Sequence, residues 1–410
     1  MMQTDLLIIG AGPGGYRAAE YAAHEGLQVV IVEQDEVGGT CLNRGCIPTK
    51  IYVHSASFVE AVERQQQVVT QLRSGVEAIL SQPNITLLRG HAEFVDANTV
   101  RVGEETVTAK NIIIATGSSA KMPPVDDIND PRVMTSTELL QLKEQPKRLC
   151  IIGAGVIGME FASVFNRFGT AVTVIEFLKE CLPMVDSDVA KRLRKLLEKR
   201  GIEFKMKTAV QHMADLDADA ILVATGRKAN TEGLNLEAAG ITLATNGTIP
   251  VDENYHCAAN IYAIGDVNGR QMLAHAAEMQ AMRGVNQIVG KTDGIRFDIM
   301  PAAIFTEPEA ACVGPSEDQL KADGIAYQCH KSFWRANGKA LAMNETEGLL
   351  KLFVDVEDRI LGCHAFGAHA ADIIQEVSVL MCRDTTLAQL RDMVHIHPTL
   401  SEVLKTAAEG

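Results

Sequence analysis

The sequence contains no block of basic residues, and its formal net charge is −14 at pH 7. Because an acidic surface repels phosphate backbones, we do not expect nucleic acid as a partner. No apolar run approaches the roughly 18 residues that a transmembrane helix needs, so we expect no membrane partner either. The N-terminal run MMQTDLLIIG has an acidic residue where a signal peptide carries positive charge. We therefore expect a cytoplasmic protein.

An evenly spaced cysteine framework is also missing, since the nine cysteines are an odd number and are scattered. This usage is typical of a reducing compartment, in which a cysteine pair would matter for its chemistry. With 47% hydrophobic and 22% charged residues, the composition excludes disorder and collagen. A length of 410 residues predicts two to three domains, each with its own core.

The chain carries an internal repeat. Residues 6–33 (LLIIGAGPGGYRAAEYAAHEGLQVVIVE) and residues 149–176 (LCIIGAGVIGMEFASVFNRFGTAVTVIE) share 11 of 28 positions, whereas chance gives about two. Each copy reads as strand, G-x-G-x-x-G turn, helix and strand, ending on Glu33 or Glu176, 23 residues after the first glycine. The glycines let backbone N–H groups meet a pyrophosphate at a helix N-terminus, and the acid accepts hydrogen bonds from a ribose. We therefore predict two dinucleotide sites, on Gly10, Gly12 and Gly15 and on Gly153, Gly155 and Gly158.

Three further apolar runs end in turns that suit a ligand. IIIATGS (112–118) follows the first copy and ILVATGR (221–227) follows the second. IYAIGDV (261–267) places Asp266 at the carboxyl end of a strand, where open α/β sheets bind ligands. Any one of them alone could equally be a plain strand-to-turn transition, but their recurrence favours a binding role.

The run GGTCLNRGCIPTK (38–50) places Cys41 and Cys46 five residues apart. A continuous helix would hold their Cα atoms about 8.6 Å apart, whereas a disulfide needs less than roughly 7 Å. A bridge therefore requires a helix break, which Gly45 permits, and Pro48 suits the first turn of a new helix starting near Cys46. There the helix dipole would lower the pKa of Cys46. The alternative is that both are small buried residues, as we expect for Cys150, Cys181, Cys257, Cys312, Cys329, Cys363 and Cys382.

A zinc site is poorly supported because no second close pair completes four ligands, and we predict no metal. Near the C-terminus, HPTLSE (397–402) pairs His397 with Glu402, which can fix the imidazole tautomer as in a catalytic triad. Alone, the pair could be a surface histidine and the acid of a helix start. His395 is the neighbour that could be mistaken for it, but the spacing to the acid favours His397.

Over essentially its whole length the sequence resembles the flavoprotein disulfide reductases (pyridine nucleotide-disulfide oxidoreductases), and among them most the dihydrolipoamide dehydrogenases. The resemblance is carried by both fingerprints, the cysteine run, YAIGD and HPTLSE. It implies that FAD lies on the first fingerprint, with Glu33 on the adenosine ribose and Asp266 on the ribityl chain. It implies that Lys50 lies near flavin N5 and pairs with Glu160. Further FAD contacts are implied at Gly39, Thr40, Ala92, Thr116, Gly117, Gly265 and Ala274.

The resemblance also implies an α/β fold with two Rossmann-like domains and an α+β dimerisation domain. The expected FAD domain comprises 1–119 and 228–295, the NAD domain 120–227 and the dimerisation domain 296–410. NAD would bind the second fingerprint, with Val210 near the adenine and Gly226 as a further contact. A carboxylate at Glu176 accepts from a 2′-hydroxyl and repels a 2′-phosphate, which favours NAD(H) over NADP(H).

The implied reaction is dihydrolipoamide + NAD⁺ ⇌ lipoamide + NADH + H⁺. Cys41 would exchange with the substrate thiol, Cys46 would face the flavin, and His397 would act on the disulfide of the other subunit of a homodimer. The substrate would be a lipoyl dithiol, either free or bound to a protein. The resemblance therefore implies a 2-oxo acid dehydrogenase complex as a partner, or a role in cell redox homeostasis.

Three alternatives are weighed. Mercuric reductases share the cysteine run but lack the C-terminal histidine, and glutathione-type reductases prefer NADP, against Glu176. A silent flavoprotein would have lost chemical residues that this chain retains. The chain is also shorter than is usual for the family, after Lys50 and between residues 213 and 218, near Val210.

Overall fold

The computed structural model describes residues 2–410 and divides the chain into two compact units. The first comprises the chain up to Ser55, Val59–Lys121 and Gly226–Ile295. The second comprises Ala56–Phe58, Met122–Thr225 and Arg296–Gly410. The chain thus leaves the first unit three times and returns to it twice. Among residues 2–410, no helix has the length and apolar character that a membrane crossing requires.

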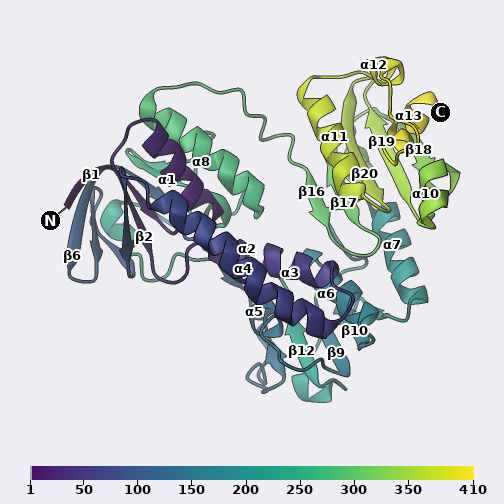
Figure 1. Ribbon diagram of the computed structural model, residues 1–410, viewed down its shortest axis with the longest axis horizontal. Coiled ribbons are helices and arrows are strands. Elements are labelled where there is room, and N and C mark those ends of the chain that lie inside the picture. The colour runs from purple at the N-terminus through teal and green to yellow at the C-terminus, as the bar shows by residue number, and fades with distance from the viewer. Residues whose placement is uncertain (1) are drawn as a thin grey trace. The chain divides into compact units, whose positions relative to one another are not determined.

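The first unit is built on an eight-stranded sheet with a parallel centre (Figure 1). Its strands are β1 (Met2–Ile9), β2 (Val29–Glu33), β3 (Ile85–Arg89), β4 (Ala92–Asp96), β5 (Thr99–Val102), β6 (Glu105–Ile114), β14 (His256–Ala258) and β15 (Ile261–Ala263). The order is β14-β15-β6-β1-β2-β3, with the β4–β5 hairpin paired to β6. Strands buried on both faces are apolar throughout, and Leu6, Leu7 and Ile8 are accordingly all fully buried.

Helices cover this sheet and carry the chain between its strands. α1 (Pro13–His24) starts directly after β1 and lies beside α8 (Ala274–Val289) (Figure 1). α2 (Gly39–Arg44), α3 (Cys46–Val53) and α4 (Phe58–Leu80) follow β2. The short antiparallel pair β7 (Ser118–Ala120) and β13 (Arg227–Ala229) lies where the chain leaves and re-enters the unit.

The second unit begins with a five-stranded parallel sheet. Its strands are β8 (Val133–Met134), β9 (Arg148–Ile152), β10 (Ala171–Glu176), β11 (Glu203–Met206) and β12 (Ala220–Val223), in the order β11-β10-β9-β12-β8. Its helices are α5 (Ser136–Leu139), α6 (Val156–Arg167) and α7 (Ser187–Lys199). The strand–glycine turn–helix–strand order of both repeat copies is therefore present, and the predicted α/β class is confirmed.

The shortened segment between β11 and β12 contains one 3₁₀ turn, η1 (Met213–Asp215). Met213 is fully buried in the core below it. The guanidinium of Arg132 donates to the carbonyls of Met213, Leu216 and Ala218 at 2.8–3.1 Å, and Asp130 holds the guanidinium from the other side. One arginine thus satisfies the carbonyls of a connection that forms no strand of its own.

The C-terminal part of the second unit is an antiparallel sheet in the order β16-β17-β20-β19-β18. Its strands are β16 (Ala302–Ile304), β17 (Ala310–Val313), β18 (Gln328–Phe333), β19 (Leu349–Val354) and β20 (Ile360–Phe366). Its helices are α9 (Glu317–Ala322), α10 (Gly338–Met343), α11 (Ala370–Cys382), α12 (Leu387–Asp392) and α13 (Glu402–Glu409). α11 packs on β17 and β20 (Figure 1). The α+β character expected of this region is confirmed.

A buried ion pair joins the two sheets of the second unit. Lys351 on β19 and Asp186, the N-cap of α7, each have 1% of their side chain exposed. The Lys351 Nζ lies 2.7 and 2.8 Å from the two carboxylate oxygens of Asp186 and 2.5 Å from Glu317 Oε2. Hydrogen bonds from Lys321 and Lys351 lower the pKa of Glu317 to about 2. Burial lowers the pKa of Lys351, but its hydrogen bonds to Asp186 and Glu317 outweigh burial, so its net pKa is raised.

We predict that Glu317→Gln destabilises the protein at neutral pH and that this deficit shrinks in acid. A carboxylate with a depressed pKa contributes its full stability above about 4.5, its ordinary value, and loses it as the pH falls toward 2. Chemical denaturation at stepped pH measures this. The same change at exposed Glu347 is the control and should leave the pH dependence unaltered. A deficit that stays constant into acid would contradict the prediction.

Candidate functional site

The first glycine loop is shaped by two contacts that exclude a side chain. A Cβ on Gly10, whose φ is +102°, would lie 2.4 Å from the carbonyl oxygen of Ala115. A Cβ on Gly15 would lie 1.8 Å from the carbonyl oxygen of Gly10. A Cβ on Gly12 would have its nearest neighbour, the Cα of Gly39, at 3.8 Å. The outer glycines are therefore required by the fold, whereas a Cβ on the middle one would make only an ordinary van der Waals contact, with Gly39.

The second loop has the same geometry. A Cβ on Gly153 would lie 2.4 Å from the carbonyl oxygen of Ala224, and one on Gly158 would lie 2.0 Å from that of Gly153. Beside Gly155 nothing lies within 4 Å. The two copies of the repeat thus fold into two equivalent glycine turns, one in each unit.

The acids at the ends of β2 and β10 are fixed in equivalent ways. Glu33 Oε2 accepts from the N–H of Ala11 at 2.7 Å, and Glu176 Oε2 accepts from the N–H of Ala154 at 2.6 Å. The other oxygen of each carboxylate accepts from a backbone N–H two residues further along the chain. A carboxylate has about four acceptor positions, so each acid can still accept ribose hydroxyls at the rim of its loop.

Asp266 follows β15 in a 3₁₀ turn, η3 (Gly265–Asn268). Its Oδ2 accepts from the hydroxyl of Ser118 and lies 3.6 Å from Nε of Arg227. Within residues 2–410 its Oδ1 accepts no hydrogen bond, so one oxygen is engaged by the chain and the other can meet a ligand hydroxyl. The sequence reasoning missed Ser118 and Arg227 as partners, although they are the last residues of the two Ala-Thr-Gly runs.

The remaining residues predicted for FAD all lie in the first unit. Gly39 approaches the loop so closely that only a residue without a side chain fits, because a Cβ there would lie 2.7 Å from the Cα of Gly12. The others are Thr40 in α2, Ala92 at the buried start of β4, Thr116 and Gly117 after β6, Gly265 in η3 and Ala274 at the start of α8. The open turn, the fixed acid and the half-engaged Asp266 form a donor and acceptor set that fits an adenine dinucleotide.

The helix break predicted between the two cysteines is present. α2 ends at Arg44, Gly45 has φ −141° and ψ −113°, and α3 begins at Cys46. A hydrogen bond between the two thiols, followed by burial, raises the pKa of Cys41, and the charge of Lys50 lowers it in part. Cys46 is exposed and Cys41 is half-buried. Lys50 lies four residues after Cys46 on α3, so both side chains share one face of that helix.

Glu160 lies buried on α6, and its Oε1 accepts from the N–H of Phe305 at 2.9 Å, just after β16. Its proposed partner Lys50 belongs to the other unit, so this pairing stays a prediction. Val210 is half-buried against the core of the second unit. Gly226, with φ +115°, lies in the first unit.

The C-terminal pair is in contact, since His397 Nδ1 lies 2.9 Å from Glu402 Oε1. Glu402 Oε2 accepts from the N–H of Thr399, and this bond, followed by that to His397, lowers the pKa of Glu402. With Nδ1–H donating to the carboxylate, Nε2 is the basic atom. The side chain of His397 is 78% exposed, whereas that of His395 is 6% exposed and lies against Glu376. Only His397 can therefore reach an external reactant.

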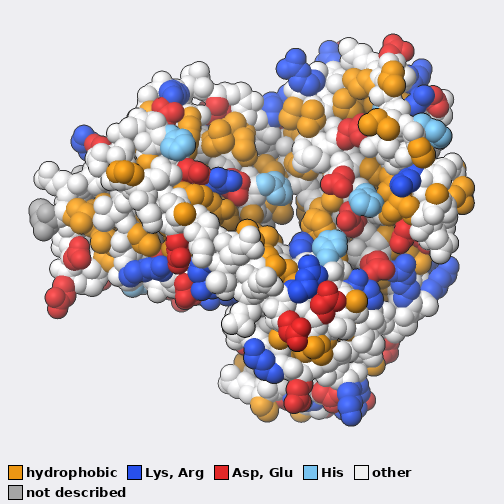
Figure 2. Space-filling view, viewed as in Figure 1, with side chains coloured by type: hydrophobic (Ala, Val, Ile, Leu, Met, Phe, Trp, Pro, Cys, Tyr) orange, Lys and Arg blue, Asp and Glu red, His pale blue; other side chains and the backbone are white. Residues whose placement is uncertain are grey.

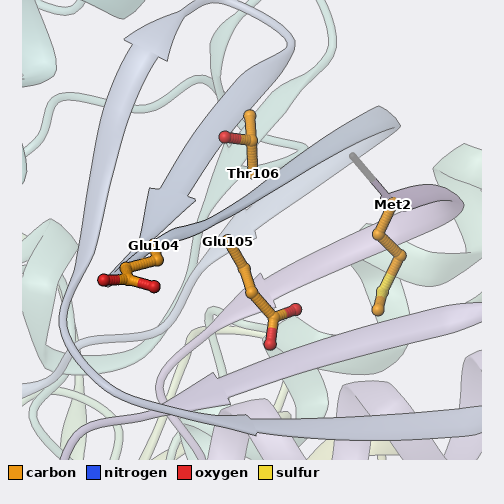
Figure 3. A pocket seen from close by; sticks show the side chains of 4 residues that line it. All are labelled: Met2, Glu104, Glu105 and Thr106. Atoms are coloured by element: carbon orange, nitrogen blue, oxygen red, sulfur yellow. The ribbon is translucent and has the colours of Figure 1, made fainter.

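Other surface features do not add to this site. A cavity of about 500 Å³ is lined by Met2 of β1, Glu104 of the β5–β6 turn, and Glu105 and Thr106 of β6 (Figure 3), none of them a predicted site residue. Figure 2 shows acidic and basic side chains interspersed over the face in view. Across residues 2–410 there is no group of three or more His, Cys, Asp or Glu that could hold a metal ion.

Comparison with known proteins assigns both parts of the chain to one kind of enzyme. Residues 4–281 match the family described as "Pyridine nucleotide-disulphide oxidoreductase", and residues 300–408 match its dimerisation domain. The chain is 36% identical over 455 aligned positions to a mitochondrial dihydrolipoyl dehydrogenase of Pisum sativum, covering 99% of this chain and 91% of the relative. It is also 36% identical to a leghemoglobin reductase of Glycine max, covering 99% and 87%.

Among solved structures, the chain resembles the HOCl-induced flavoprotein disulfide reductase RclA of Escherichia coli, with a TM-score of 0.93 and 34% identity over 99% of both chains. A Cu(II) complex of RclA matches with a TM-score of 0.94 and 32% identity, covering 100% of this chain and 99% of that one.

We predict that Gly158→Ala and Gly155→Ala separate folding from nucleotide binding. The first places a Cβ against a carbonyl oxygen and should cost at least about 2 kcal/mol of stability. The second has open space, so it should melt like the wild type but lose affinity for NAD⁺, whose pyrophosphate needs that space. Thermal unfolding and calorimetric titration with NAD⁺ measure the two effects. Equal melting losses, or undiminished binding by Gly155→Ala, would overturn this assignment.

We predict that His397→Gln lowers dithiol-dependent turnover by roughly 10²-fold or more, as expected for loss of a general base. Glu402→Gln should lower it less, because the imidazole stays but loses the carboxylate that fixes its tautomer. The matched control is His369→Gln, since His369 is also exposed and also lies against a carboxylate, that of Asp372. Similar losses in the control would show that the effect is not specific to this pair.

Proposed function

Because the chain belongs to the pyridine nucleotide-disulphide oxidoreductase family, we propose that it is a dihydrolipoamide dehydrogenase, an enzyme that oxidises a lipoyl dithiol and reduces NAD⁺. The observation that carries the proposal is the hydrogen-bonded pair Cys41 and Cys46 across a helix break, followed on the same face by Lys50. Dihydrolipoyl dehydrogenases among the relatives, aligned over 99% of the chain, support the choice of substrate.

Enzymes of this family use FAD and NAD(H), and so does this chain. We propose that FAD is held by the first glycine loop, Glu33 and Asp266, and NAD(H) by the second loop and Glu176. We propose domain limits of 1–119 with 228–295 for FAD, 120–227 for NAD and 296–410 for dimerisation. The dimerisation domain supports a homodimer.

The residues of the chain account for the thiol chemistry. The partner subunit's His397 accepts a proton at Nε2 from the substrate dithiol, and the resulting thiolate attacks Cys41 Sγ of the oxidised pair. The Cys41–Cys46 bond breaks, a mixed disulfide forms, and Cys46 leaves as a thiolate. The second substrate thiol then displaces Cys41, which releases the cyclic disulfide. FAD held by the first glycine loop, Glu33 and Asp266 would supply the redox chemistry that links the thiol pair to the nicotinamide nucleotide.

We propose a lipoyl dithiol carried by a 2-oxo acid dehydrogenase complex, or a free lipoyl dithiol, as the substrate, and the cytoplasm as the location.

A second candidate activity is reduction of Cu(II) by NADH, because the RclA structures match the whole chain and one of them is a Cu(II) complex. The balanced reaction is NADH + 2 Cu²⁺ → NAD⁺ + 2 Cu⁺ + H⁺. The thiol pair would then bind Cu(II) in place of a dithiol. This reaction would not need the His397–Glu402 pair as a base.

We predict that the FAD-loaded protein forms NADH from dihydrolipoamide and NAD⁺ and that Cys46→Ser abolishes this turnover. Without the second sulfur no redox disulfide can form. The control is Cys382→Ser. The expectation that Cys382 is buried was wrong, because it lies at the end of α11 and is exposed, as Cys46 is. This control should leave the rate within twofold of the wild type.

The same preparation distinguishes the two candidates. Rapid dithiol-dependent NADH formation with slow Cu(II) reduction supports the dehydrogenase. Fast NADH-dependent Cu(II) reduction that survives His397→Gln, without dithiol turnover, would replace it by the second candidate.

A further inference from the structure

The segment from Phe177 to Asp186 follows the nicotinamide-side acid and leads into α7. Within it, Leu182 is buried and has φ +48°, a backbone conformation that side chains with a Cβ rarely adopt. The N–H of Leu182 donates to the carbonyl oxygen of Ala154 at 2.9 Å. Ala154 lies inside the second glycine loop, so this segment holds the loop directly. A conformation of this kind persists only where the surroundings impose it.

The same segment is fixed at its other end, at Asp186. Its Oδ1 accepts from the N–H groups of Asp188 and Val189, which caps α7. Its Oδ2 accepts from the N–H of Glu317, and Lys351 Nζ bridges both oxygens. The carboxylate is therefore saturated by donors from two parts of the chain.

The backbone of Asp186 is held as well. Its N–H donates to Nδ1 of His364 at 2.9 Å, and Nε2 of His364 lies 3.2 Å from the carbonyl oxygen of Gly314. His364 therefore acts as a neutral acceptor. Burial, the largest cause, lowers its pKa, which keeps it neutral. The next residue, Ser187, donates from its N–H and its hydroxyl to Asp318.

All of these outside partners belong to the C-terminal sheet and its helix α9. The loop that faces the nucleotide is thus connected by one short segment to a point fixed by β19, β20 and α9. We propose that Lys351 of the dimerisation domain is a positioning residue for nicotinamide nucleotide binding, acting through Asp186 and Leu182 on the second glycine loop. This inference rests on the proposed NAD(H) site at that loop.

A purely stabilising role explains the arrangement less well. A buried ion pair is weak evidence for stability, since a hydrophobic pair of similar volume often does as well or better. β19 is otherwise apolar on both faces, so a lysine is the exception in LLKLFV. The ion pair fixes the position of the Asp186 carboxylate at the end of the constrained segment. A hydrophobic pair would not do so.

The test compares Lys351→Met with Lys331→Met in the full-length, FAD-loaded protein. Lys331 lies opposite Lys351 in register on the neighbouring strand β18, but it is exposed. Calorimetric titration of the oxidised enzyme with NAD⁺ gives the dissociation constant, and steady-state assays give KM and kcat. Anaerobic flavin reduction by dihydrolipoamide, without nucleotide, reports the half-reaction that does not use the second loop.

For Lys351→Met we expect the NAD⁺ dissociation constant and KM to rise roughly tenfold, which is an ordinary coupling between linked sites. FAD content, the dithiol half-reaction and kcat should stay within twofold, and Lys331→Met should behave as the wild type. A folded Lys351→Met with unchanged NAD⁺ affinity would overturn the inference. Equal losses in the half-reaction, or the same loss in Lys331→Met, would also overturn it, because they indicate a general structural defect.

His364→Leu tests the same anchor if Lys351→Met does not fold, because it removes a neutral acceptor and leaves no buried charge unpaired. It should weaken NAD⁺ binding, and His364→Gln, whose amide oxygen can accept from Asp186, should restore it. Equal affinities in the two His364 variants would contradict the anchor.

The proposed function can fail independently. If the wild type binds NAD⁺ but does not oxidise dihydrolipoamide, the substrate is wrong and the affinity comparison still decides the role of Lys351. If the wild type does not bind NAD⁺, both the site and this inference are overturned.

Discussion

Both nucleotide loops depend on a backbone contact that leaves no space for a side chain. A Cβ on Gly15 would lie only 1.8 Å from the carbonyl oxygen of Gly10. In the second loop, a Cβ on Gly158 would lie 2.0 Å from the carbonyl oxygen of Gly153. This contact brings the first turn of α1 and of α6 onto the end of the preceding strand and leaves the middle glycine open. The fixed acids, the turn bearing Asp266 and the start of α2 are all placed relative to that geometry.

The cysteine pair that we propose as the redox site depends on a break in regular structure. A continuous helix would keep the two thiols apart, whereas the turn at Gly45 brings them into hydrogen-bond contact at the start of α3. The thiol pair and Lys50 belong to the first unit, and Glu160 and the His397–Glu402 pair belong to the second. Each group is held by hydrogen bonds within its own unit.

The C-terminal sheet does more than supply a dimerisation surface. Through Asp186, Lys351 and His364 it holds the segment that supports the nicotinamide-side loop, and through Phe305 it contacts Glu160 on α6. The parallel and antiparallel sheets of the second unit are therefore linked by buried polar contacts, which require defined geometry, and not only by apolar packing.

The sequence alone determined the features whose chemistry is local: both glycine loops with their acids 23 residues on, the helix break between the cysteines, and the His397–Glu402 pair five residues apart. Each depends on spacing along one short stretch, and backbone geometry converts that spacing directly into position. Only the tertiary structure revealed Ser118 and Arg227 on Asp266, Arg132 on the shortened connection, and Lys351 on Asp186. These partners lie 39 to 165 residues apart. No local pattern can indicate which distant donor will meet a buried acceptor, because that is decided when the sheets pack.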